Sequence, residues 1–355
     1  MRGGRRSRSS RSASGSSSSA PASTRRGRRS EPLPGYLIRR VLWAVWLFFV
    51  ATFITYVIFF LIPSDPGRLR AFGFTASPVQ AAKIKSELHL DVPAYQQYWI
   101  FVWNMIRHAS LGYSFENGAS VRWILGQDAR VTGSLVLGAA VFWVLIAVPV
   151  GILSALRPRS VFDRFAMAFV LIGIAAPPIW LGLILTYVFG FKLGWTPIAD
   201  YCNFATSSGG ECSGPLRWAY HLLLPWITFM FFFAAFYVRL IRASMLDVVH
   251  EDYVRTAVAK GASARRVVFH HVLRNSMLPV VTFLGTNIAY ALGTVIFVED
   301  VFNLHGLGVE MLSSARTSDV PVVVGVVVFV TLTVIVANFL VDIAYAWLDP
   351  RIRLG

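Results

Sequence analysis

The chain has 355 residues, of which 55% are hydrophobic and only 14% are charged, so it is too apolar for an ordinary soluble domain. Its formal net charge of +15 does not indicate nucleic-acid binding, because 11 of the 33 Lys and Arg residues fall within the first 40 positions and most of the others flank apolar runs. The composition therefore indicates an integral membrane protein whose cations set its topology and contact anionic headgroups.

The first 35 residues are composed almost entirely of Arg, Ser, Gly and Ala, and no aromatic residue precedes Tyr36. Such a segment cannot bury enough apolar area to offset the entropy of ordering, so we expect residues 1–35 to be a disordered basic tail. Contact with anionic lipid and a dispensable tail are both open interpretations. Residues 36–355 are expected to form one transmembrane domain.

Six apolar runs lack Asp, Glu, Lys and Arg. About 20 helical residues cross about 30 Å of hydrocarbon, so these runs predict an all-α integral membrane protein with six transmembrane helices. The fourth is the shortest. The first run follows Arg39 and Arg40 but is too long for a secretion signal and lacks a small-residue cleavage site, so it is expected to remain as an anchor. The runs are about 41–62, 131–156, 165–190, 222–238, 278–298 and 321–341.

The first connection, residues 63–130, is long enough to form a small external helical segment. Ser77 followed by Pro78 has the pattern of an N-cap and a first-turn proline, and Pro93 begins a second predicted helix. We expect one face of that second helix to serve in packing or in anchoring at the membrane interface. The residues of this face are Tyr95, Tyr98, Trp99, Val102, Met105 and Ile106.

Pro149 falls within the second run, and Pro177 and Pro178 fall within the third. A proline inside a transmembrane helix frees backbone groups that neighbouring helices or water must satisfy, so such kinks often face a cavity. These three prolines are candidates for shaping a translocation path. Plain helix packing is the alternative interpretation.

Cys202 and Cys212 lie in the third connection, within the stretch YCNFATSSGGEC. If this loop faces an oxidising compartment, the two thiols are able to pair, which would contribute on the order of 2 to 3 kcal/mol through loop-closure entropy. Two free thiols are the alternative. No metal site is predicted, because two cysteines do not form one alone and no neighbouring His completes a ligand set.

Residues 243–277 form a strongly basic connection between the fourth and fifth runs. Asp252 is predicted to cap a helix over residues 253–260, Gly261 to end it in the left-handed conformation, and Ser263 to cap a second helix that runs into the fifth span. Such short helices are not stable alone in water, so the hairpin must dock on its own bundle or on another protein. Val267, His271 and Val272 line one side of the second helix, while Arg265, Arg266 and Arg274 stay solvated.

Basic residues are distributed unevenly between the connections. The second connection carries Arg157, Arg159 and Arg164 and the fourth is rich in Lys and Arg, whereas the fifth carries only Arg316. By the positive-inside rule, the even connections and both termini are expected in the cytoplasm. The protein is therefore predicted to be a multi-pass protein of the cell (inner) membrane.

Several sequence patterns are missing. There is no G-x-x-x-x-G-K-[ST], H-E-x-x-H or G-x-S-x-G, and His270 and His271 point to different helix faces, so neither ATP binding nor catalysis by this chain is expected. The six apolar cores also lack ionisable residues near their centres, where an ion-coupled carrier commonly keeps them. If the protein moves a solute, the energy must come from elsewhere.

The stretch DYVRTAVAKGASARRVVFHHVLRNSMLPVVT closely resembles the cytoplasmic coupling loop of ATP-binding-cassette importer permeases, in the form of the oligopeptide and dipeptide group. The spacing of Gly261 to Leu278 and Pro279 matches that group. LHLDVPAYQQY, SLGYSF, FGFKLGWTPI, VFVEDVFNLHGLG and DIAYAWLDPRIR resemble other parts of the same family, so the resemblance covers residues 36–355.

This resemblance implies a type I importer permease fold and a heteromeric peptide importer. Its implied partners are a homologous second permease, two cytoplasmic ATPase subunits that bind ATP and Mg²⁺, and an external substrate-binding protein. A nickel-chelate or glutathione importer of the same group, and a stand-alone carrier or channel, are the alternatives. The implied ATPase-coupling residues are Tyr253, Arg255, Thr256, Ala257, Lys260 and Gly261.

Overall fold

The structure is a computed structural model that describes residues 33–58, 92–108, 110–114, 116–205, 212–317 and 319–348. Nearly all of the predicted tail, and the predicted cap at Ser77 and Pro78, lie outside these residues. Regular secondary structure in the described ranges is helical. The elements are α1 (Leu33–Tyr56), α4 (Ala94–His108), α5 (Val121–Leu156), α6 (Val161–Ala175), α7 (Pro178–Leu185), the π-helical η2 (Thr186–Lys192), α8 (Pro215–Val249), α9 (Asp252–Ala259), α10 (Ala264–Arg266), the π-helical η3 (Val267–Val272), α11 (Leu273–Val301), α12 (Leu307–Arg316) and α13 (Val320–Leu348).

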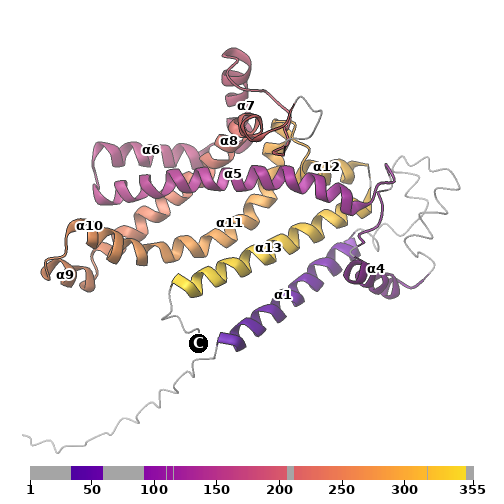
Figure 1. The fold of residues 1–355 in the computed structure, drawn as a ribbon, viewed down its shortest axis with the longest axis horizontal. Coiled ribbons are helices and arrows are strands. Elements are labelled where there is room, and N and C mark those ends of the chain that lie inside the picture. The colour runs from indigo at the N-terminus through magenta and orange to yellow at the C-terminus, as the bar shows by residue number, and fades with distance from the viewer. Residues whose placement is uncertain are drawn as a thin grey trace, which may run out of the picture.

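The predicted number of spans is confirmed when one broken helix is counted as a single span. Five helical segments among the described residues are individually long and apolar enough to cross a membrane, and α6 followed by α7 and η2 makes a sixth, bent span. Figure 1 shows the long helices lying side by side, with α9 and α10 at one end of the bundle and α12 at the other. The chain is therefore an all-α, multi-pass membrane protein.

The fourth span is the centre of the bundle, and its helix is much longer than the short apolar run that marks it in the sequence. Helix α8 has 35 residues and packs against α5, α6, α7 and α11. Charged residues near its end, such as Arg239 and Arg242, interrupt the apolar run without interrupting the helix. Phe233 and Tyr237 of α8 both stack on Trp143 of α5, with ring centroids 4.6 and 6.3 Å away.

Prolines break the third span. Pro177 is the N-cap of α7 and Pro178 its first residue, and the axes of the two halves differ by 105°. Both prolines lie inside the third span, as predicted, and they divide it: Pro178 has no amide hydrogen to continue α6 and Pro177 adopts an extended conformation, so the first helix ends at Ala175. Pro149, in contrast, lies within the continuous helix α5.

Helix α4 begins directly after Pro93, as predicted, but its predicted single face is divided. Tyr98 and Val102 are buried against Tyr56 of α1, and the Tyr98 hydroxyl lies 3.1 Å from Thr52 Oγ1. Trp99 and Ile106, expected on the same side, are more than 60% exposed. Helix α1 covers only the strip of α4 around Tyr98 and Val102, so packing accounts for that strip, and anchoring at the membrane interface stays a prediction for the exposed residues.

A buried ion pair joins one end of α6 to α8. Arg242 Nε donates to Asp163 Oδ1 at 2.7 Å and Arg242 Nη2 donates to Asp163 Oδ2 at 2.9 Å. The same carboxylate accepts hydrogen bonds from the Ser154 hydroxyl and from the backbone N–H of Arg159. A bidentate pair with these additional donors fixes the orientation of the α5–α6 turn relative to α8.

Arg242→Ala is expected to destabilise the bundle by about 3 kcal/mol, because it leaves the buried Asp163 carboxylate without its cation. Arg239→Ala is the matched control, since Arg239 is exposed on the same helix. The melting temperature of each variant is measured by heating samples and monitoring the remaining folded protein by size-exclusion chromatography. Equal melting temperatures for Arg242→Ala and Arg239→Ala would show that the ion pair contributes nothing. Replacing both partners with Leu and Met should recover most of the loss.

Candidate functional site

The basic connection after α8 folds as a helical hairpin at one end of the bundle. Two residues separate the end of α8 from the start of α9, Gly261 reverses the chain, and α10, η3 and α11 then run on as one continuous helical segment. The first helical residue is Asp252, and Glu251 is the N-cap, so the predicted cap was wrong by one position. Ser263 is the N-cap of α10, as predicted, but its side chain makes no capping hydrogen bond.

Gly261 ends α9 in the predicted left-handed conformation, with φ of +80°. The Ala262 N–H donates to Ala257 O at 3.2 Å and the Gly261 N–H donates to Val258 O at 2.9 Å. These two bonds define a Schellman motif, which satisfies carbonyls that the helix end would otherwise leave open. A Cβ at Gly261 would meet no atom within 4 Å, so the backbone conformation, and not lack of space, favours glycine here.

Gly261→Ala is expected to destabilise the turn by about 1 to 2 kcal/mol, the strain of an L-residue in this conformation. Hydrogen exchange of the α9 amides should then be roughly tenfold faster, since about 1.4 kcal/mol is a factor of ten. Gly293→Ala is the control, because Gly293 also has open space around a Cβ but lies within α11. It should leave α9 exchange unchanged, and equal exchange in the two variants would contradict the assignment of strain to Gly261.

One face of the hairpin is held by the protein's own bundle. Val254 of α9 is only 4% exposed and lies in the main core cluster with Val267 and Val272, the two valines predicted to line a buried side. The Tyr253 hydroxyl accepts a hydrogen bond from Asn275 Nδ2 at 2.7 Å and donates to the His271 carbonyl at 3.5 Å. The hairpin is thus anchored at its base.

The last turn of α9 is open, although Val258 lies on the same side of the helix as Val254, one turn further on. Val258 is 57% exposed, and Thr256 and Lys260 are exposed beside it. Arg255 forms a solvent-exposed ion pair with Asp252 at 3.9 Å, and the Thr256 hydroxyl donates to the Asp252 carbonyl at 2.9 Å. An exposed valine among small and polar side chains on a short helix is suited to a shape-fitting contact with another protein.

The structure separates the six sequence-predicted coupling residues into two groups. Arg255, Thr256, Lys260 and Gly261 are exposed and Ala257 is half-buried, so these five line the open side or the tip of the hairpin. Tyr253, although 41% exposed, uses its hydroxyl inside the hairpin. Val258 was not among the predicted residues. Val258 follows Val254 by four residues, so the sequence pattern puts both valines on one buried stripe and gives no sign that Val258 is exposed.

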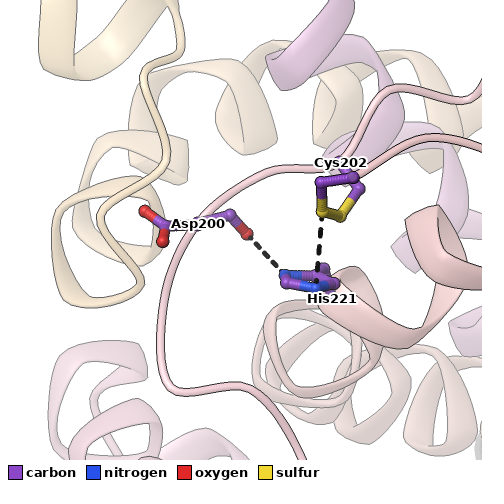
Figure 2. The surroundings of a disulfide bond; sticks show 4 residues. Asp200, Cys202 and His221 are labelled. Carbon is purple, nitrogen blue, oxygen red and sulfur yellow. Dashed lines mark hydrogen bonds between the residues drawn. A yellow bond between two sulfur atoms is a disulfide. The ribbon is translucent and has the colours of Figure 1, made fainter. Parts of the chain in front are cut away.

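The two cysteines are joined in a disulfide whose Cα atoms are 5.0 Å apart. Figure 2 shows His221, from the first turns of α8, pointing at this disulfide. His221 Nε2 lies 3.7 Å from Cys212 Sγ, and His221 Nδ1 lies 3.3 Å from the Asp200 carbonyl. The prediction that no histidine neighbours the cysteines was wrong, because α8 brings His221 back against the loop.

A buried carboxylate fastens α12 to the end of α11. Glu299 is fully buried and accepts hydrogen bonds from Thr132 Oγ1 at 2.5 Å and from the backbone N–H groups of Gly308 and Val309 at 2.9 and 3.1 Å. Thr132 Oγ1 in turn accepts from the Leu307 N–H at 2.8 Å. The sequence reasoning missed Glu299, whose only signal was an acid at the end of an apolar run.

Comparisons with known proteins agree with one another. Residues 34–136 and 147–354 match the N-terminal and main family models of the inner membrane component of binding-protein-dependent transport systems. A probable peptide ABC transporter permease of Sinorhizobium fredii is 34% identical over 90% of this chain and 99% of its own length. The dipeptide transport system permease DppB of Escherichia coli K12 is 33% identical over 90% of this chain and 98% of its own length. A putative peptide transport system permease of Brucella abortus is 33% identical over 89% of this chain and 98% of its own length.

Proposed function

Because the chain belongs to the family of inner membrane components of binding-protein-dependent transport systems, we propose that it is a permease subunit of an ATP-driven peptide importer. The peptide substrate is supported by the names of the relatives, each of which the chain matches over almost its whole length. The chain carries no catalytic site in this proposal. ATP and Mg²⁺ bind to partner subunits, and hydrolysis takes place there.

The α9 hairpin is the proposed contact with an ATPase subunit. The observation that carries this proposal is the difference between the two ends of α9: Val254 anchors its first turn in the bundle, while Val258 and the residues around it leave the last turn open. Since α8 leads into the hairpin and α11 leads out of it, a force applied to α9 acts directly on two packed spans. Rigid-body movement of those spans would alternate access to the two sides of the membrane.

The remaining partners follow from the family. A homologous second permease completes the translocation path, and an external substrate-binding protein delivers the peptide. The distribution of basic residues supports a cytoplasmic location for the hairpin and both termini. The broken span at Pro177 and Pro178 supports a role in the path, since non-helical backbone at membrane depth is stable only where protein or a water-filled cavity surrounds it.

Reconstitution in liposomes tests this function. The chain is co-expressed with candidate permease, ATPase and binding-protein partners, and ATP hydrolysis and peptide uptake are measured with and without peptide-loaded binding protein. Stimulated hydrolysis together with ATP-dependent uptake is the expected result. Uptake by this chain alone without nucleotide would instead establish a stand-alone carrier, and stimulation by nickel chelates or glutathione but not by peptides would reassign the substrate.

A further inference from the structure

Three side chains of metal-binding type converge where the 200–205 loop meets α8. Cys202 is fully buried, Cys212 and His221 are half-buried, and their ligand atoms all lie within 4.8 Å of one another. Figure 2 shows the imidazole of His221 between the disulfide and the backbone of Asp200. The proposed peptide transport uses none of these groups.

The hydrogen bond to Asp200 decides which nitrogen of His221 is available. A carbonyl oxygen only accepts hydrogen bonds, so the Nδ1 atom that lies 3.3 Å from Asp200 O carries the proton. The lone pair of Nε2 is then directed to the side of Cys212, 3.7 Å from its sulfur. A backbone carbonyl that holds one ring nitrogen while the other faces a ligand position is the usual support of a metal-bound histidine.

The distances suit a tetrahedral site. Zinc–sulfur bonds of about 2.3 Å and zinc–nitrogen bonds of about 2.0 to 2.1 Å place sulfur and nitrogen about 3.5 Å apart at a tetrahedral angle. The separation of His221 Nε2 from Cys212 Sγ is already close to that value. Two thiolates and one imidazole are a soft ligand set that favours Zn²⁺-like cations over Mg²⁺ or Ca²⁺, and a water molecule would fill the fourth position.

We propose that Cys202, Cys212 and His221 form a redox-controlled site for one thiophilic divalent cation. In the oxidised state the disulfide holds the loop and no thiolate is available. A dithiol reductant transfers two electrons and two protons to the disulfide, which breaks the S–S bond and leaves two thiols and an oxidised, disulfide form of the reductant. Binding of the cation then forms two metal–sulfur bonds and one metal–nitrogen bond and releases both thiol protons. Both the disulfide and the metal bridge would link Cys202 to Cys212, and the metal would also link them to His221 of α8.

Zinc titration of the assembled, detergent-solubilised complex tests the site. The complex is reduced with a dithiol, freed of reductant without oxygen, and titrated with Zn²⁺ against a chromophoric chelator. A complex carrying Cys202→Ser and Cys212→Ser supplies the background from other subunits. The reduced protein should bind one more Zn²⁺ per chain than this background, and the oxidised protein should bind none above it. Co²⁺ in place of Zn²⁺ should give a thiolate charge-transfer absorption.

His221→Ala should weaken Zn²⁺ binding by more than about tenfold, since loss of a supporting group alone costs 10- to 100-fold. His221→Cys keeps a ligand at the position and should restore binding, which separates loss of a ligand from damage to the fold. His305→Ala is the matched control, because His305 is exposed in the loop before α12. Zinc binding by the reduced protein no greater than background, equal binding by the oxidised protein, or wild-type affinity in His221→Ala would overturn the proposal.

Discussion

Val258→Glu is expected to abolish peptide-stimulated ATP hydrolysis in the assembled transporter, with a loss of more than about tenfold. The side chain is 57% exposed in the open last turn of α9, so the substitution leaves the hairpin and the bundle intact. At a packed protein interface, however, a carboxylate must lose its hydration, and an unpaired buried charge there costs several kcal/mol, which is more than tenfold in affinity. Co-purification of the ATPase subunits and stimulated hydrolysis measure the effect.

Two further variants separate docking from folding. Met311→Glu places the same charge on an exposed position of α12, at the opposite end of the bundle in Figure 1, and should retain the ATPase subunits. Val254→Ala removes buried apolar atoms from the anchored first turn and should loosen α9 in hydrogen exchange, at a cost of about 1 to 2 kcal/mol. If Val258→Glu retained both the ATPase subunits and full stimulation, α9 would not be the coupling contact.

Glu299→Ala is expected to detach α12 from α11 and α5 and to destabilise the protein by at least about 3 kcal/mol. Three hydrogen-bond donors, from Thr132, Gly308 and Val309, lose their acceptor at once, and each unsatisfied buried donor costs about 1 to 3 kcal/mol. Thermal unfolding measures the total, and hydrogen exchange over Leu307–Arg316 locates it.

Glu299→Gln and Asp300→Ala sharpen this prediction. The glutamine keeps one acceptor oxygen but turns an amide N–H₂ toward a donor, so its effect should lie between wild type and alanine. Asp300 is the next acid on the same helix and is exposed, so Asp300→Ala should change stability by no more than about 0.5 kcal/mol. Unchanged exchange of α12 in Glu299→Ala would mean that apolar packing around Leu307, and not the carboxylate, holds this helix.

Local signals predicted the hairpin well. Gly261 was identified from its place between two short helical patterns, and the structure has it at positive φ for the expected reason. Val267 and Val272 were expected to be buried and are. A four-residue helical period puts Val254 and Val258 on the same face of α9, and the angle at which α9 leaves α8 decides that the bundle covers only the first of them.

The sequence predicted the number of spans better than their geometry. Counting apolar runs was sufficient for the number of membrane crossings. The length of an apolar run did not give the length of the helix in α8. Its charged end continues the helix, and Asp163 on α6 provides a partner for Arg242 there. Counting apolar runs also gave no sign that the helix axis turns by 105° after Ala175, although both prolines were recognised.

Local patterns were enough to predict a multi-pass helical membrane protein with a basic hairpin between its fourth and fifth spans, because hydrophobicity and glycine conformation act over a few neighbouring residues. Helix packing sets the contacts between different elements: Asp163 with Arg242, Thr132 with Glu299, and His221 with the disulfide. Polar groups buried in this bundle must find partners, and those partners are set by the packing of helices against one another, which no local pattern encodes.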